Sequence, residues 1–253
     1  MLNAHNPTHW KFLFQAMAKT RRQYGTPAMF YDVADRLGRR LIGLVASHIF
    51  CYELDPGAET PPSDKEFSFR FLTSEDIRSF AADPVNELDD CMADRVATGR
   101  DLCFGVLSAD RLAGYGWCAL HSVEGAHTGG VSISFPPRMG YMYKGFTHPD
   151  YRGRRLNGLR MALAARALAE QWVHQLIALV DWTNWNSLRS CRRSSCRELG
   201  MLVGLTWAGK QRWWIPEAAR QLGIRFGEEA GVPLGDWLRT TKPTSIALEA
   251  SLQ

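Results

Sequence analysis

Basic residues gather in one short segment near the middle of the chain, at Arg152, Arg154, Arg155 and Arg160. Between positions 138 and 160, six Lys or Arg residues accompany a single carboxylate, that of Asp150. The apolar residues before this segment predict a strand that ends at Thr147, and the Leu- and Ala-rich residues after it predict a helix from Leu156. A loop between a strand and a helix N-terminus presents backbone N–H groups and the positive end of the helix dipole. We therefore expect an anion, such as a phosphate, to bind there.

Residues 149–157, Pro-Asp-Tyr-Arg-Gly-Arg-Arg-Leu-Asn, resemble the coenzyme A loop of the GNAT superfamily of acyl-CoA-dependent N-acyltransferases. The family motif is Gln/Arg-x-x-Gly-x-Gly/Ala after a strand, usually preceded by Pro-x-Tyr-Arg-Gly. Arg152 and Gly153 match its opening, whereas Arg155 and Asn157 stand at the two later small-residue positions. The resemblance implies that the loop wraps the pyrophosphate of acetyl-CoA or another acyl-CoA. The donor-binding residues that it implies are Tyr143, Gly145, Phe146, Thr147, Arg152, Gly153, Arg154, Arg155, Leu156, Asn157, Gly158, Asn184 and Ser187.

Two later segments extend the resemblance. Residues 183–190 are similar to the Asn-x-x-Ser helix of the family, and residues 196–201 are similar to its closing Tyr-x-x-Leu-Gly-Phe. The resemblance covers about residues 67–215 and looks closest to members found in surface-polysaccharide loci. It implies an α/β (α+β) fold: a mixed, mostly antiparallel, twisted sheet flanked by helices.

Acyl transfer from a thioester to an amine needs a base for the ammonium proton, a donor for the oxyanion and an acid for the leaving thiolate. A base is expected in the loop between the third and fourth strands, or at the end of the fifth. The resemblance implies an oxyanion donor on the backbone of residues 143–146, where Gly145 fits a strand that bulges. Cys196 stands where many members carry the Tyr that protonates the thiolate, with Tyr141 and Tyr143 as alternatives. The candidate catalytic residues are thus Glu124, Asp181 and His121 as bases, Glu124 before the others, and Cys196 as the acid.

Three functions stay open at this point. The first is transfer of an acetyl or short acyl group from acyl-CoA to a primary amine of a small acceptor, for example an amino sugar. The second takes the acyl group from an acyl carrier protein, whose acidic surface would suit the excess arginines. The third is a non-catalytic module that binds CoA or a partner protein, because two glycines and the Tyr of the family pattern are replaced.

Three regions are expected along the chain: an N-terminal helical extension with a linker (1–60), the acyltransferase domain (67–215) and a C-terminal extension (216–253). Helical spacing of apolar residues at 10–24 and at 28–52 predicts a helical hairpin. The Pro- and Gly-containing residues 55–66 predict a linker. The hairpin can cap the sheet, form a homodimer contact or lie on a membrane surface, and we favour packing against the core.

Composition narrows the class of protein. The 253 residues are 45% hydrophobic and 22% charged, as in globular proteins, and the net charge of +4 is too small to indicate nucleic-acid binding. The six cysteines contain no Cys-x-x-Cys pair, and the first ten residues do not read as a signal peptide. The most apolar segment, residues 41–52, is too short to span a bilayer. We expect a cytoplasmic protein with no transmembrane segment, and no zinc site, Walker loop or nucleophile elbow is found.

Overall fold

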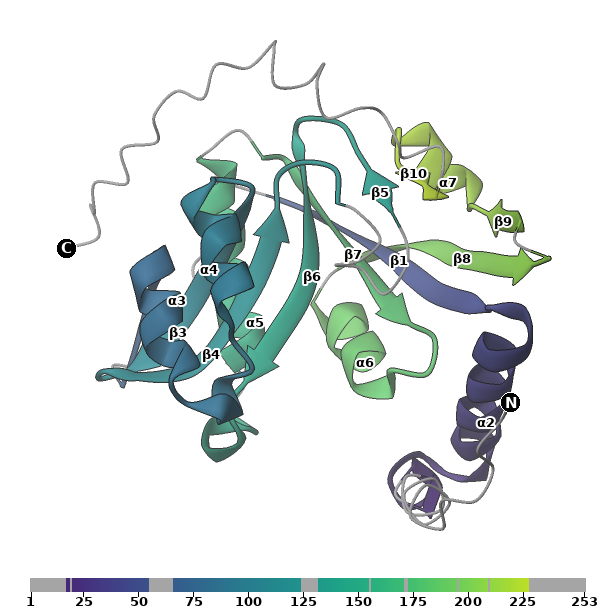
Figure 1. Ribbon diagram of the computed structural model, residues 1–253, viewed down its shortest axis with the longest axis horizontal. Helices are drawn as coiled ribbons and strands as arrows, with labels where there is room; N and C mark the ends of the chain where they lie inside the picture. Colours follow the sequence, from purple (N-terminus) through teal and green to yellow (C-terminus); the bar gives the residue numbers. More distant parts are fainter. Residues whose placement is uncertain are drawn as a thin grey trace.

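An eight-stranded sheet organises the molecule (Figure 1), in the order β2-β3-β4-β6-β7-β1-β8-β9. The computed structural model describes residues 17–18, 20–54, 66–123, 132–154, 156–170, 173–194, 196–208 and 210–227. Neighbouring strands are antiparallel except β6 and β7, which are parallel. The mixed, mostly antiparallel sheet flanked by helices that the sequence predicted is therefore confirmed.

One half of the sheet is formed by β2 (Phe67–Phe71), β3 (Asp101–Ser108), β4 (Arg111–Ala119) and β6 (Met139–Thr147). Helices α3 (Ser74–Ala81) and α4 (Asp90–Ala97) lie in front of these strands in Figure 1, and α5 (Leu156–Ala169) lies behind them. Short 3-10 turns occur at Pro84–Asn86 and Pro149–Tyr151. Helix α3 begins at a reciprocal capping box formed by Thr73 and Asp76.

The other half is formed by β7 (Gln175–Asp181), β1 (Val45–Glu53), β8 (Arg197–Trp207) and β9 (Lys210–Trp214). Helix α2 (Thr26–Ile42) precedes β1, and α6 (Trp185–Arg193) follows β7. A small second sheet pairs β5 (Ile133–Ser134) with β10 (Arg225–Phe226), just after α7 (Glu217–Gln221). The described part of the C-terminal extension thus packs on the sheet, where Ala219, Ile224 and Phe226 are buried in one core cluster with Ile49 and Tyr141.

The helical interpretation of residues 28–52 is wrong in its second part. The helix ends at Gly43, which has a left-handed φ of 53°, and the chain continues as strand β1. This strand lies between β7 and β8 in the sheet, so the last part of the expected helical extension is a sheet strand. The end of the first expected helix is confirmed, because residues 20–24 are helical. The division of the chain into three regions stays a prediction.

The membrane and disulfide expectations can be compared with the described residues. Among them, no helix combines the length and the apolar character that crossing a bilayer requires. All six cysteines are described, and each is a free thiol. The described residues contain no group of three His, Cys, Asp or Glu side chains that could hold a metal ion.

Candidate active site

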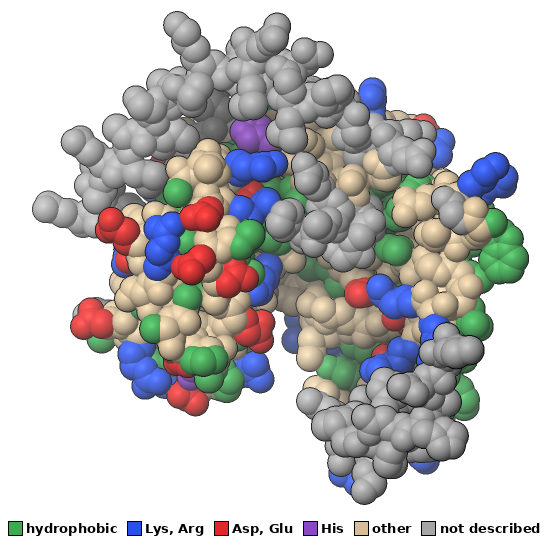
Figure 2. All heavy atoms as spheres, viewed as in Figure 1, with side chains coloured by type: hydrophobic (Ala, Val, Ile, Leu, Met, Phe, Trp, Pro, Cys, Tyr) green, Lys and Arg blue, Asp and Glu red, His purple; other side chains and the backbone are tan. Residues whose placement is uncertain are grey.

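The two parallel strands separate partway along their length. Pairing between β6 and β7 runs from Met139 opposite Gln175 to Met142 opposite Ala178 and then stops. Beyond that point β6 stays with β4 and β7 stays with β1. A cavity of about 510 Å³ is lined by both strands where they separate. Figure 2 shows the surface indented between the part that carries α3 and α4 and the part that carries α6.

A bulge in β6 lies at the start of this gap. Met142 pairs with Cys118 and Lys144 with Trp117, so Tyr143 has no register partner on β4, and it has none on β7. Tyr143 lies within the range expected to supply the oxyanion donor. The sequence analysis expected the bulge at Gly145, two residues after its position in the structure.

The bulge determines which side chains face each side of the sheet. Tyr143 and Lys144 both face the α3–α4 side, where the Tyr143 hydroxyl donates to Asp101 (2.6 Å) and the Lys144 amine lies 5.7 Å from the Tyr115 ring centroid. Gly145 faces the α5 side, opposite Gly116 of β4. The gap therefore has two different faces.

Arg160 of α5 fills the space that these two glycines leave. A Cβ on Gly116 would lie 1.2 Å from its Nη1, and a Cβ on Gly145 would lie 3.1 Å from its Nη2. The residue is 6% exposed, lines the cavity and pairs with no carboxylate among the described residues. Its Nη2 donates to Asn157 Oδ1 (2.5 Å). Burial lowers its pKa to about 10, so the guanidinium remains charged at neutral pH.

The expected anion loop lies between β6 and α5. Gly153 has a φ of 84°, a conformation that favours glycine, and no atom lies within 4 Å of where its Cβ would be. Arg152 is exposed, and its Nε donates to the carbonyl of Thr147 (3.3 Å). Arg154 turns toward β2, where it pairs with Glu66 (2.6 Å). Arg155 lies outside the described residues.

Helix α6 closes the same side of the cavity. Asn184 caps the helix, because its side-chain oxygen accepts from the backbone N–H of Ser187 (3.2 Å), and both residues line the cavity. Ser190 accepts from Asn157 Nδ2 (3.2 Å), which links α6 to α5. Three of the implied donor-binding residues, Asn157, Asn184 and Ser187, are therefore brought together.

Two of the thiols that line the cavity, Cys191 and Cys196, lie close to each other in sequence near the end of α6. A hydrogen bond with Cys191, together with burial, raises the pKa of Cys196, and the same hydrogen bond lowers the pKa of Cys191. The acid role expected for Cys196 stays a prediction, and Cys191 is its hydrogen-bonded neighbour at the cavity. Cys191 was not singled out from the sequence, although it lies in the last turn of α6, five residues before Cys196.

The three candidate bases differ in position. Asp181 is the last residue of β7 and lines the cavity. Alternation along β7 puts it with Ile177 and Leu179 on the face opposite α5 and α6. His121 is exposed, follows β4 and does not line the cavity. Glu124 lies outside the described residues.

The remaining implied donor residues do not line the cavity. Phe146 is buried and stacks on Tyr115 with ring centroids 5.1 Å apart. Leu156 is buried in another core cluster, and Thr147 ends β6 at the loop. Gly158 is open, with no atom within 4 Å of where its Cβ would be.

Comparisons with known proteins concern the fold. No protein-family model matches the chain, and no curated protein sequence matches it. A structure from Novosphingobium aromaticivorans described as a GNAT-family acetyltransferase is 13% identical with a TM-score of 0.43, covering 64% of this chain and 63% of that one. A GCN5-related N-acetyltransferase from Kribbella flavida is 13% identical with a TM-score of 0.46, covering 70% and 64%. An aminoglycoside acetyltransferase from an uncultured soil metagenomic sample, in complex with trehalose, is 11% identical with a TM-score of 0.41, covering 52% and 89%. The chain spans less than two thirds of the first two proteins.

Proposed function

We propose that the protein transfers an acyl group from acyl-CoA to a primary amine of a small acceptor. The observation that carries the proposal is the cavity where β6 and β7 separate, with a buried guanidinium on one face and a carboxylate on the other. A donor that carries phosphates and an acceptor that carries an ammonium group have opposite charges. The two faces match this pair of ligands.

The residues on the α5 side fit an acyl-CoA. Arg160 offers donors that no carboxylate of the described residues satisfies, and Asn157 adds an amide beside it. The first turn of α5 and the loop before it supply backbone N–H groups for the pyrophosphate. When bound, acyl-CoA supplies an activated acyl thioester. The residues that hold it are then Arg160, Asn157 and the backbone from Arg152 to Gly158.

The residues on the face opposite α5 suit the removal of a proton from the ammonium group of the acceptor. Burial raises the pKa of Asp181 above that of an ordinary aspartate, which makes the carboxylate a better acceptor for a proton from an ammonium group. The backbone N–H of Tyr143, a residue with no register partner, is our candidate donor to the carbonyl oxygen, and one such donor contributes about 3–4 kcal/mol. We assign the base role to Asp181, with Glu124 as the next residue to test.

The narrower expectations remain part of the proposal. Acetyl-CoA is the donor that we expect, and an amino sugar used in surface-polysaccharide assembly is the acceptor class. Donation by an acyl carrier protein is the alternative, and the basic side chain that suits it is the exposed Arg152. We retain a cytoplasmic location as a prediction.

An assay for acylated product tests the proposed function. Purified protein, acetyl-CoA and a panel of primary amines that includes amino sugars are expected to give an N-acetylated product, detected by mass spectrometry. Thiol-reactive dyes are avoided because Cys91 is exposed. Acylation only with an acyl carrier protein would favour the alternative donor. CoA binding without any product from either donor would favour a non-catalytic module.

A further inference from the structure

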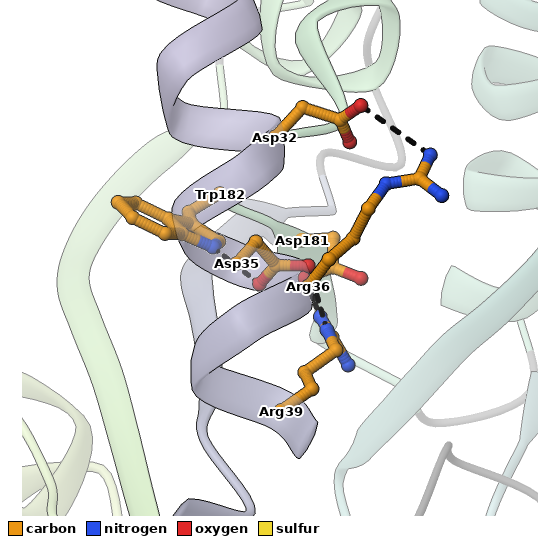
Figure 3. Close-up of polar contacts among 6 residues, drawn as sticks. All are labelled: Asp32, Asp35, Arg36, Arg39, Asp181 and Trp182. Carbon is orange, nitrogen blue, oxygen red and sulfur yellow. Dashed lines mark hydrogen bonds and ion pairs between the residues drawn. The ribbon is translucent and has the colours of Figure 1, made fainter. Parts of the chain in front are cut away.

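Helix α2 reaches the end of β7 through a chain of polar contacts (Figure 3). Asp35 accepts from the indole Nε1 of Trp182 (2.6 Å) at one oxygen and from Nε of Arg39 (2.7 Å) at the other. Arg39 Nη2 then donates to Asp181 Oδ1 (2.6 Å). The candidate base is therefore held by a residue 142 positions earlier in the chain.

Asp35 and the aromatic contacts of helix α2 hold Arg39 in place. The side chain of Asp35 is only 8% exposed, and both of its oxygens accept hydrogen bonds. Tyr31 packs against the rings of Trp182 and Trp185, with centroids 5.6 and 6.0 Å apart. Helix α2 is thus anchored to the segment that follows β7, and the guanidinium of Arg39 is pre-oriented before any ligand binds.

The local net charge around Asp181 favours binding of a cation. The charged groups that act on it are Arg39 and Asp35 from α2, and its register partner on β1, Ser47, is uncharged. Two carboxylates and one guanidinium sum to −1. Arg39 occupies Oδ1, whereas Oδ2 accepts no hydrogen bond from the described residues, and the side chain is 44% exposed. An ammonium group can therefore approach Oδ2 without displacing Arg39.

We propose that Arg39, held by Asp35, is a positioning residue that fixes the carboxylate of Asp181 at the acceptor side of the cavity, so that helix α2 belongs to the active site. This inference rests on the proposed function, because it assigns a task to the candidate base. Arg39 itself lines the cavity beside Val45 and Ser47, the first residues of β1 to reach it. The acceptor pocket is therefore built by the N-terminal part of the chain as well as by β6 and β7.

Opposite shifts in pH dependence test the proposal. Arg39 lowers the pKa of Asp181 and Asp35 raises it. Arg39→Met is expected to move the acid limb of the kcat/KM profile to higher pH, so the loss of activity is largest at the acid end of the profile and shrinks as pH rises. Asp35→Asn is expected to move the limb to lower pH, and Arg39→Lys is expected to restore most of the wild-type profile. Arg36→Met is the matched control, because Arg36 pairs with Asp32 on the same helix, away from Asp181 (Figure 3).

A second readout separates this inference from the proposed function. Carbon-13 NMR titration of the Asp181 carboxyl needs no turnover, and the same opposite shifts are expected in Arg39→Met and Asp35→Asn. If wild-type protein acylates no amine while these shifts appear, the proposed function fails and the contact network stands. If activity is present and Arg39→Met loses it equally at every pH, or loses none, the positioning role is overturned. Should Arg39→Met fail to fold, Asp35→Asn decides by the direction of its shift, and Arg39→Lys decides by whether it keeps the wild-type profile.

Discussion

The two faces of the gap between β6 and β7 both contain arginine, yet they favour opposite ligands. On the α5 side, Arg160 is buried with no carboxylate partner among the described residues. On the other side, Arg39 pairs with Asp181 and Arg95 pairs with Asp101. An unpaired buried guanidinium attracts an anion, whereas a paired one orients a carboxylate. The partner of each arginine, and not the number of arginines, therefore indicates which ligand a face receives.

Removal of the carboxylate on the acceptor face is expected to have the largest effect. Asp181→Asn removes the proposed base and should lower kcat about 10²- to 10⁴-fold, while CoA affinity stays nearly unchanged because the donor binds to the other face. The rate should recover in part as pH rises, since free amine becomes available. The measurements are a pH profile and CoA calorimetry, with Asp32→Asn on α2 as the control.

Wild-type rates for Asp181→Asn from pH 6 to 9 would remove this residue from the mechanism. The same profile would then be measured for Glu124→Gln, and for His121 after it. A large fall in CoA affinity would instead indicate that the two faces are not separate.

Removal of the Arg160 guanidinium from the donor face is expected to have the second-largest effect. Arg160→Met eliminates charged hydrogen bonds, each typically about 1.5–3 kcal/mol, and should weaken CoA binding roughly 10- to 100-fold by calorimetry. The Tm should stay equal or rise, because an apolar side chain replaces a buried charge without a carboxylate partner. Arg166→Met, at an exposed position of the same helix, is the control. A lowered Tm with unchanged CoA affinity would make Arg160 structural.

The smallest effect is expected at Gly158 in the first turn of α5. A Cβ there meets no atom within 4 Å, so Gly158→Ala should stabilise the helix by about 0.5–1 kcal/mol and raise Tm by roughly 2–4 °C. If the pyrophosphate approaches this backbone closely, CoA affinity should fall at the same time, by less than about 10-fold. Unchanged CoA affinity in the more stable variant would contradict close approach at this position.

The order of strands and helices around the donor face could be predicted from sequence, because local patterns determine it. A strand before Thr147, a helix from Leu156 and a capped helix after Asn184 each depend on neighbouring residues only. The slot for Arg160 could not be predicted. It depends on Gly116 and Gly145 facing each other across two strands, and the bulge at Tyr143 sets that register.

Strand β1 was misread for a physical reason. A strand between two others is buried on both faces, so its residues form a continuous apolar run instead of an alternating one. Here Ile49, Phe50 and Cys51 are all buried, and only two residues separate the end of α2 from the start of β1. The error also hid the contact of Arg39 with Asp181, because that contact exists only when β1 pairs with β7.

The central place of β1 has a consequence for the way the chain is synthesised. Both strands that flank β1 come much later in the sequence: Asp35 and Trp182 are 147 positions apart, and His48 and Glu198 are 150 apart. At roughly 5–20 residues per second, a ribosome needs about 7–30 s to make that length of chain. During this interval β1 has emerged without either neighbour, and its apolar residues must stay shielded from other chains. The middle of the sheet therefore closes late, and the pocket between β6 and β7 is completed only after its last lining residue, Cys196, has been made.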